Sequence, residues 1–255
     1  MIGKTEQYYR DTLARKGAML FSLIDPDKTQ LEKGAEIALK SAEAGADVIL
    51  VGGSIGAQGD VLDNTIRMIK ENVNIPVVLF PGNISGVSSY ADAVYFMSML
   101  NSRDTYWLAT AQIQAAPAVA RSKIEPIATT YLVIEPGRAV GWIGNANLVP
   151  RDRADLAAAC ALAAKYMGTH VLITDSGSGA PEPIPIPMAH AVAQACGNDV
   201  MYFVGGGVRS VKQASDLIDA GVHGLQVGTA FEEGDLVKKV KEMAKAVHDA
   251  GKKRV

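Results

Sequence analysis

Cysteine is scarce in this 255-residue sequence, which contains only Cys160 and Cys196. Both lie in alanine-rich segments without CxxC spacing, so they indicate small buried apolar residues rather than a disulfide or a metal-binding pair. Long apolar runs are also missing, since none approaches the roughly 18 residues that a membrane span needs. The polar amino terminus lacks the apolar core of a signal peptide. We therefore expect a cytoplasmic protein with at most peripheral membrane contact.

A large excess of charge of one sign is absent as well. The sequence has 25 Lys and Arg residues against 27 Asp and Glu residues, which gives no electrostatic basis for binding nucleic acid. Its 48% hydrophobic and 20% charged residues are typical of a globular protein with a sizeable core. No proline-rich or serine-rich linker divides the chain, and α/β barrels are often of this length. We predict a single domain over residues 1–255.

What the sequence does contain is a regular alternation of short apolar runs and longer segments with helical periodicity. Continuous apolar strands are typical of a parallel sheet whose outer face is covered by helices. Eight such runs with intervening helices favour an α/β fold of the (β/α)8 TIM-barrel type over an open sheet. The predicted strands begin at Ala18, Asp47, Pro76, Ala93, Ile127, His170, Met201 and Gly224.

Two connections depart from this regular pattern. Only "NISGVSSYAD" joins the third and fourth predicted strands, which is too short for a crossover helix. Either the fourth strand is misassigned, or one helix of the barrel is reduced to a turn. After the fifth strand, the long segment "EPGRAVGWIGNANLVPRDRAD" precedes the next helix. Long loops at the carboxyl ends of barrel strands usually belong to the active face.

Glycines gather where the seventh and eighth predicted strands end, as Gly205, Gly206 and Gly207 and then as Gly228 beside Thr229. In a barrel these turns form the habitual phosphate site, where backbone N–H groups point at the anion and a Cβ would hold it away. A turn that merely needs positive φ angles is the alternative, but one glycine would satisfy that need. The sequence thus predicts a phosphate site, and the lack of a GxGxxG pattern disfavours a dinucleotide.

A polar loop follows the sixth predicted strand. Asp175 ends this strand, and the loop continues as Ser176, Gly177, Ser178 and Gly179. Serine hydroxyls and free backbone amides suit phosphate or polyol contacts, and Asp175 is placed to accept a proton from a substrate hydroxyl. A flexible connector, with the aspartate capping the turn, is the alternative interpretation.

Oxygen ligands follow the first two predicted strands. Asp25 ends the first strand in "LIDPDK", and Ser54 follows the second strand in "VGGS". A carboxylate and a hydroxyl, completed by phosphate oxygens and waters, suit Mg²⁺. Asp-Pro-Asp is also an ordinary turn and helix cap, so the argument depends on the position of Asp25 and Ser54 opposite the phosphate turns. The two halves of the rim would then hold two different anions.

Other kinds of site find little support. The four histidines show no ligand spacing, and His170 and His223, which precede strands, are expected to be structural. No Ser-His-Asp order, nucleophilic cysteine or Schiff-base lysine is visible. Trp107 and Trp142 lie in or near rim segments, where they fit either the cover of an apolar substrate or contacts between subunits.

Together these motifs resemble the geranylgeranylglyceryl phosphate synthase family of archaeal lipid synthesis. The resemblance rests on "LIDPDK", "VGGS", "LFPGNISGVSSYADAVYFMSMLNSRD", "LVIEPGRAVGWIGNANLVPRD", "DSGSGAPEP", "VGGGVRS" and "VGTAFEE", which occur in family order over nearly the whole chain. The family is similar to bacterial heptaprenylglyceryl phosphate synthases, and the "GWIG" loop resembles the larger-loop group found in many archaea. The resemblance implies a modified TIM barrel whose third helix is replaced by a short segment.

The resemblance also implies an activity, namely transfer of a geranylgeranyl group from its diphosphate to the 3-hydroxyl of sn-glycerol 1-phosphate, with Mg²⁺ present. Asp25 and Ser54 match the magnesium positions, and we assign Asp175 the removal of the hydroxyl proton. A homo-oligomer, dimer or hexamer, is implied too. The prenyl chain would need an apolar groove, for which the missing third helix suggests an opening. The matched glycerol-phosphate contacts are Ile173, Thr174, Asp175, Ser176, Gly177, Ser178, Gly179, Gly206, Gly207, Gly228 and Thr229.

The sequence departs from the family where Tyr-Leu-Glu often precedes the glycine loop, because it has Ile173-Thr174-Asp175. The acid is kept, one methylene shorter, but the tyrosine hydroxyl is missing from this strand. Two alternatives stay open here. Another phosphate-handling barrel enzyme, of histidine, tryptophan or thiamine synthesis, would share the last two turns but not the Asp-Ser metal pair. A catalytically silent phosphate-binding or assembly protein would be consistent with the missing tyrosine.

Overall fold

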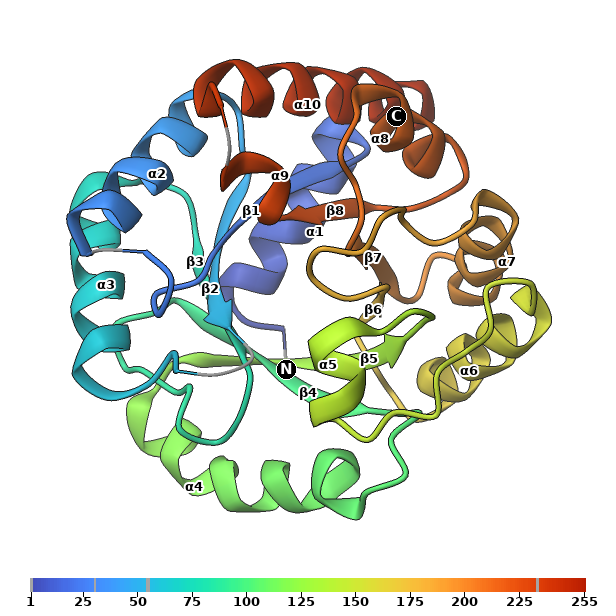
Figure 1. Cartoon of the computed structure of the whole chain (residues 1–255), viewed down its shortest axis with the longest axis horizontal. Helices are drawn as coiled ribbons and strands as arrows, with labels where there is room; N and C mark the ends of the chain where they lie inside the picture. The colour runs from blue at the N-terminus through green and yellow to red at the C-terminus, as the bar shows by residue number, and fades with distance from the viewer. Residues whose placement is uncertain (1, 30, 54–55, 233) are drawn as a thin grey trace.

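Eight parallel strands close into a barrel in the order in which they follow one another in the sequence (Figure 1). The computed structural model describes residues 2–29, 31–53, 56–232 and 234–255. The apolar runs become strands because their side chains are buried both inside the barrel and beneath the helices. The predicted TIM barrel is confirmed. The strands are β1 (Met19–Ile24), β2 (Val48–Gly53), β3 (Val77–Pro81), β4 (Ala93–Met99), β5 (Glu125–Val133), β6 (Val171–Asp175), β7 (Met201–Gly205) and β8 (Gly224–Val227).

A ring of helices surrounds the barrel (Figure 1). The final long helix illustrates why: Val240, Met243, Ala244 and Val247 are buried on one side of it, while its lysines face outward. The helices are α1 (Lys4–Lys16), α2 (Leu31–Glu43), α3 (Gly59–Asn72), α4 (Ala111–Ser122), α5 (Arg138–Ile143), α6 (Ala154–Tyr166), α7 (Ile186–Cys196), α8 (Val211–Asp219), α9 (Thr229–Glu232) and α10 (Leu236–Gly251), with a π-helical segment η1 (Tyr106–Thr110) and a 3-10 segment η2 (Lys252–Arg254).

The connection between β3 and β4 contains no helix, and all of its residues are described. Residues 82–92 pass from one strand to the next as turns and bends, and β4 pairs in parallel with both β3 and β5. The fourth strand was therefore assigned correctly, and the predicted loss of one helix is confirmed. At β4, the outer face of the barrel packs against η1 and α4, which come later in the chain.

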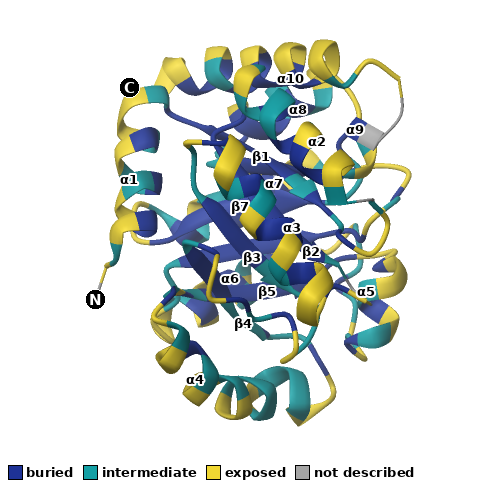
Figure 2. Cartoon of the chain, turned by 90° about the vertical axis from the view of Figure 1, so that its left-hand side faces the viewer, coloured by how far each residue is buried: buried dark blue, intermediate teal, exposed yellow. Residues whose placement is uncertain are grey.

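Helix α1 lies across the amino-terminal end of the barrel, a helix that the polar sequence of residues 4–16 did not predict. Its Tyr9 is fully buried and packs edge-on against Phe21 and Phe203, with ring centroids 5.5 and 5.9 Å away. Figure 2 shows α1 at one end of the molecule and α5 and α9 at the opposite end. Since α1 closes one end, we expect a functional site at the carboxyl ends of the strands.

The histidines that precede strands have structural roles, as predicted. His170 Nδ1 lies 2.8 Å from the buried carboxylate of Glu6 on α1. His223 Nδ1 accepts the backbone N–H of Tyr202 at 3.0 Å, and burial lowers the pKa of His223 to about 4. Within the described ranges, no helix is long and apolar enough to cross a membrane.

Candidate active site

Two adjoining cavities open at the carboxyl ends of the strands. The first, which we call the glycine pocket, has a volume of about 60 Å³ and lies between the loops that follow β6, β7 and β8. The second, which we call the apolar groove, has a volume of about 190 Å³ and extends over β4 toward α4. The glycine pocket is lined by residues 178–180, 205–209 and 226–230 together with Leu23, Phe80 and Asp175.

The backbone itself requires the three glycines at the end of β7 and in the turn that follows it. Gly206 and Gly207 both have positive φ angles, 76° and 77°, so the expectation that one glycine would satisfy this turn is wrong. A Cβ on Gly207 would lie 2.2 Å from the main-chain carbonyl of Glu182. Gly205 has an ordinary φ, but a Cβ there would lie 2.7 Å from Asp175 Oδ2. The three glycines therefore let the turn after β7 approach Asp175 and the loop after β6 closely.

Side chains hold the three loops of the glycine pocket in place. Ser178 Oγ and Thr229 Oγ1 are 3.1 Å apart, which joins the loop after β6 to the start of α9. The guanidinium of Arg209 donates to the carbonyl oxygens of Gly179 and Ala180 at 3.4 and 3.2 Å. It thereby places a positive charge beside the pocket, where an anion is stabilised. Arg209 was not among the predicted site residues, although a cation directly after a glycine turn is the signal that could have identified it.

The predicted glycerol-phosphate residues do not all reach the pocket. Ile173 is fully buried inside the barrel, and Thr174 Oγ1 hydrogen-bonds with Tyr202 Oη on the helix-facing side at 2.8 Å. Ser176 is fully buried with its Oγ unpartnered among the described residues, and Gly177 packs beneath residues 137–138. None of these four lines either cavity. The remaining predicted contacts lie together in the glycine pocket: Asp175, Ser178, Gly179, Gly206, Gly207, Gly228 and Thr229.

Asp175 ends β6 as predicted, and its carboxylate has two hydrogen-bond donors. Tyr131 Oη donates to Oδ2 at 2.8 Å, and the backbone N–H of Gly177 donates to Oδ1 at 2.5 Å. Burial nevertheless raises the pKa of Asp175, against the opposite effect of these donors. Tyr131 on β5 is the register partner of Ile173 on β6. The hydroxyl missing at position 173 is therefore matched by a hydroxyl from the neighbouring strand.

Replacing this tyrosine tests how far it supports the carboxylate. In Tyr131→Phe, the ionised form of Asp175 loses a charge-assisted hydrogen bond, so the pKa of Asp175 rises further. We expect kcat/KM for the prenyl transfer that the sequence motifs imply to fall about 10-fold to 100-fold at neutral pH. The acid limb of its pH profile should move to higher pH. The matched control is Tyr202→Phe, which removes another buried tyrosine hydroxyl, bonded to Thr174 outside both cavities. An unchanged acid limb in Tyr131→Phe would contradict this role.

Two carboxylates lie at the opposite side of the rim, where Mg²⁺ was predicted. A Cβ on Gly53, at the end of β2, would lie 2.9 Å from Asp27 Oδ1 and 3.7 Å from Asp25 Oδ1. Lys28 donates to Asp25 Oδ2. Hard carboxylate oxygens of this kind fit Mg²⁺, and Asp27 is an addition to the predicted pair. Ser54, the other predicted ligand, lies outside the described residues.

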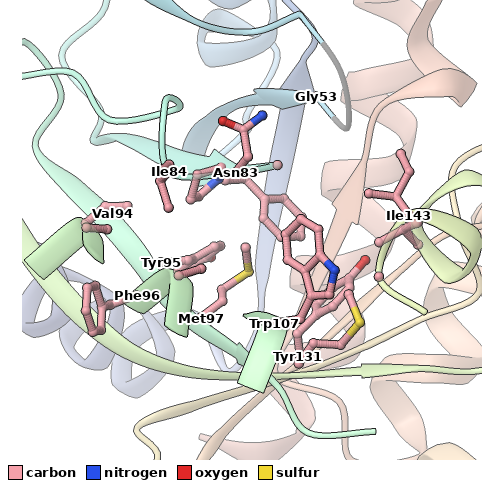
Figure 3. A pocket seen from close by; sticks show the side chains of 18 of the residues that line it. Gly53, Asn83, Ile84, Val94, Tyr95, Phe96, Met97, Trp107, Tyr131 and Ile143 are labelled. Atoms are coloured by element: carbon pink, nitrogen blue, oxygen red, sulfur yellow. The ribbon is translucent and has the colours of Figure 1, made fainter. Parts of the chain in front are cut away.

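The apolar groove opens where the connection between β3 and β4 is short. Side chains on the outer face of β4, Val94 and Phe96, line it together with Ala115 and Val119 of α4. Figure 3 shows the side chains of β4 with Trp107 and residues of the neighbouring strands around this space. The missing helix therefore leaves room for an apolar chain, as the sequence suggested. The lining residues could not be identified from sequence, because they come from many segments that lie far apart in the chain.

Trp107 enters the groove from the π-helical segment η1. Two side chains satisfy carbonyl groups in this irregular segment: Ser98 Oγ donates to Leu108 O at 2.7 Å, and Gln112 Nε2 donates to Trp107 O at 3.1 Å. Trp107 therefore lines an apolar cavity, one of the two roles considered for it. Trp142 is 86% exposed and lines neither cavity.

The two cavities meet at four residues. Leu23, Phe80, Asp175 and Ser178 line both of them. A hydroxyl group held in the glycine pocket can therefore approach the end of an apolar chain in the groove beside the carboxylate of Asp175.

Comparison with known proteins agrees with this architecture. The sequence profile of the PcrB family matches residues 12–248. The chain belongs to the PcrB family. Among curated PcrB relatives, it is 47% identical to the geranylgeranylglyceryl phosphate synthase of Methanosarcina acetivorans over 245 residues, which cover 96% of this chain and 99% of that protein. The family expected from the sequence motifs is thereby confirmed.

A solved structure is similar over nearly the whole chain. The (S)-3-O-geranylgeranylglyceryl phosphate synthase of Thermoplasma acidophilum, in complex with sn-glycerol-1-phosphate, has a TM-score of 0.91 and 34% identity and covers 98% of this chain and 100% of its own. The thiamine phosphate pyrophosphorylase of Pyrococcus furiosus has a TM-score of 0.60 at 15% identity, with 93% of this chain and 98% of its own covered. The second likeness shows a shared barrel fold alone.

Proposed function

We propose that this chain is a prenyltransferase that joins a geranylgeranyl group to the 3-hydroxyl of sn-glycerol 1-phosphate and releases diphosphate. The observation that carries the proposal is the position of Asp175, a buried carboxylate at the junction of a small polar pocket and a long apolar groove. Such a junction suits the meeting of a polar acceptor and an apolar donor. The near full-length similarity to proteins named for this activity supports the same conclusion.

The acceptor lies in the glycine pocket. Its phosphate faces the backbone N–H groups of Gly206, Gly207 and Gly228, which carry no Cβ to hold it away, and the charge of Arg209 lies beside them. This contact fixes the acceptor, so that its 3-hydroxyl faces Asp175 and the apolar groove. Positioning of this kind converts a reaction between two free molecules into one within a single complex.

The donor lies in the apolar groove with its reactive end at the junction. The 3-hydroxyl oxygen forms a bond to the first carbon of the prenyl chain, and the bond from that carbon to the diphosphate oxygen breaks. The hydroxyl proton passes to Asp175 Oδ1 or Oδ2, for which the raised pKa makes the carboxylate a stronger base. Apolar walls around the reactive carbon exclude water, which would otherwise compete for the donor.

We expect the proposed reaction to depend on Mg²⁺. Asp25 and Asp27, together with the predicted ligand Ser54, would hold the ion, and a bound ion would neutralise charge on the diphosphate. Lys28, which lines the groove beside Asp25, supplies a further positive charge on this side of the rim. The two anions are thus bound at separate places, the monophosphate at the glycine turns and the diphosphate near β1 and β2.

The test is a product assay with labelled sn-glycerol 1-phosphate and prenyl diphosphates of several chain lengths, with Mg²⁺ and with a chelator in excess. We expect a prenyl ether with the geranylgeranyl donor and at least a 10-fold lower rate with the chelator. The absence of any lipid product at every chain length would contradict the proposed function and favour a silent phosphate-binding protein. A homo-oligomer, dimer or hexamer, stays a prediction that light scattering of the purified protein would measure.

A further inference from the structure

Gln226, on β8, was not among the residues predicted to contact a substrate. Its side chain points into the barrel, where Nε2 donates to Tyr95 Oη at 3.2 Å, and the residue is only 4% exposed. Its Oε1 has no hydrogen-bond partner among the described residues. A buried carbonyl oxygen without a partner is costly. Gln226 lines the glycine pocket, so a molecule bound there can supply the missing donor.

The position of Gln226 relative to Asp175 follows from the register of three strands. Asp175 on β6 is the register partner of Gly205 on β7, and Gly205 is the register partner of Gln226 on β8. Register partners in neighbouring strands point to the same side of a sheet. Because Gly205 has no side chain, the carboxylate and the amide face one shared space above it. A side chain at 205 would fill this space, since its Cβ would already lie 2.7 Å from Asp175 Oδ2.

The two side chains differ in what else they reach. Asp175 lines both the glycine pocket and the apolar groove, whereas Gln226 lines only the glycine pocket. A hydroxyl that reacts with the donor must therefore lie toward Asp175. A hydroxyl that faces Gln226 is turned away from the donor and does not react.

We propose that Gln226 selects the acceptor: its Oε1 accepts a hydrogen bond from the 2-hydroxyl of the glycerol phosphate, while Asp175 receives the 3-hydroxyl. This inference rests on the proposed function and adds a third contact point to it. Phosphate at the glycine turns, the 3-hydroxyl at Asp175 and the 2-hydroxyl at Gln226 are three points around one carbon. Three such points distinguish an acceptor from its mirror image.

Tyr95 orients the amide for this contact. Its hydroxyl receives the Gln226 Nε2–H and lies 3.5 Å from the hydroxyl of Tyr9 on α1. Because Gln226 Nε2 already donates to Tyr95 Oη, Oε1 is the amide atom left for the acceptor. Gln226 is thus a positioning residue, and its loss should change acceptor binding and selectivity rather than the pH profile set by Asp175.

The experiment compares two acceptors with two proteins. The acceptors are sn-glycerol 1-phosphate and 3-hydroxypropyl phosphate, which lacks only the 2-hydroxyl, and the proteins are wild type and Gln226→Met, a swap of similar shape. We expect wild type to prefer the glycerol phosphate about 10-fold to 100-fold in kcat/KM. In Gln226→Met, the KM for glycerol phosphate should rise by the same factor, and the two acceptors should become equivalent. The KM for the prenyl diphosphate and the acid limb of the pH profile should not change.

Two results would overturn the inference: equal discrimination by Gln226→Met and wild type, or no discrimination by wild type. If Gln226→Met does not fold, Tyr95→Phe is the second variant, and it should weaken the preference for the 2-hydroxyl without abolishing turnover. If wild type makes no prenyl ether with either acceptor, the proposed function is wrong. Calorimetry of both phosphates with both proteins then still decides the inference, since a 2-hydroxyl preference that survives in Gln226→Met overturns it.

Discussion

Asp175→Asn should lower kcat about 100-fold to 10,000-fold, which is the usual contribution of a general base. Asparagine has nearly the same shape and can keep both hydrogen bonds, with its oxygen toward the N–H of Gly177 and its NH₂ toward Tyr131 Oη. The loss would therefore report the missing proton acceptor rather than a displaced loop. The measurement is single-turnover kinetics of prenyl transfer, with circular dichroism to establish that the fold is intact. Undiminished turnover would remove the role assigned to Asp175.

The same substitution should stabilise the protein at neutral pH. The pKa of Asp175 is raised in the folded state by burial. The contribution of Asp175 to stability is therefore greatest at low pH, where Asp175 is protonated, and it is lost as the pH rises through the folded-state pKa. Asparagine carries no charge to bury. We expect a higher melting temperature than wild type at pH 7 and no difference below the pKa of an unfolded aspartate, about 3.9.

Asp47 provides the matched control, because it is also buried but lies at the other end of the barrel. Burial opposes its ionisation, yet hydrogen bonds from His248 and Lys16 at 2.8 and 2.6 Å lower its pKa overall. Asp47→Asn should therefore lower the melting temperature at pH 7 and leave prenyl transfer unchanged. If the two stability changes have opposite signs, then Asp175, unlike Asp47, lies in an environment that disfavours its charged form. Such an environment is expected of a reactive carboxylate.

The barrel could be predicted because its signals are local. Each strand is a short apolar run, and "NISGVSSYAD" is visibly too short to contain a helix. Helix α1 could not be predicted, because only Tyr9 and a few polar residues of its thirteen-residue length are buried. Its position depends on contacts with Phe21 and Phe203, which lie far away in the sequence.

The candidate site divides in the same way. The glycine turns and Asp175 could be placed on the rim, because strand ends in a barrel meet at one edge. Tyr131 and Gln226 could not, since in sequence each is one more inward-facing strand residue. Their roles emerge from register: Tyr131 lies opposite Ile173, and Gln226 lies opposite Gly205. Pairing between strands is a property of the closed barrel and cannot be deduced from the sequence of any single strand.

Gly207→Ala should raise the KM for sn-glycerol 1-phosphate about 100-fold or more while the KM for the prenyl diphosphate stays unchanged. The added Cβ would meet the main chain of Glu182 and Pro183 at 2.2 to 2.5 Å, at a φ of 77° that alanine rarely adopts. The loops after β6 and β7 must then separate, and the backbone N–H groups no longer converge on the phosphate. Loss of two hydrogen bonds to a charged group accounts for an effect of this size.

Gly168→Ala separates strain from binding. Gly168 also has a positive φ, 85°, but a Cβ there meets nothing within 4 Å, and it lies before β6 at the closed end of the barrel. We expect it to lose about 1 to 2 kcal/mol of stability from backbone strain alone and to keep its acceptor KM. If Gly207→Ala and Gly168→Ala changed the KM for sn-glycerol 1-phosphate equally, the glycine turn after β7 would have no part in holding the phosphate. A rise confined to Gly207→Ala would place the monophosphate at this turn and leave the carboxylates near β1 and β2 for the diphosphate.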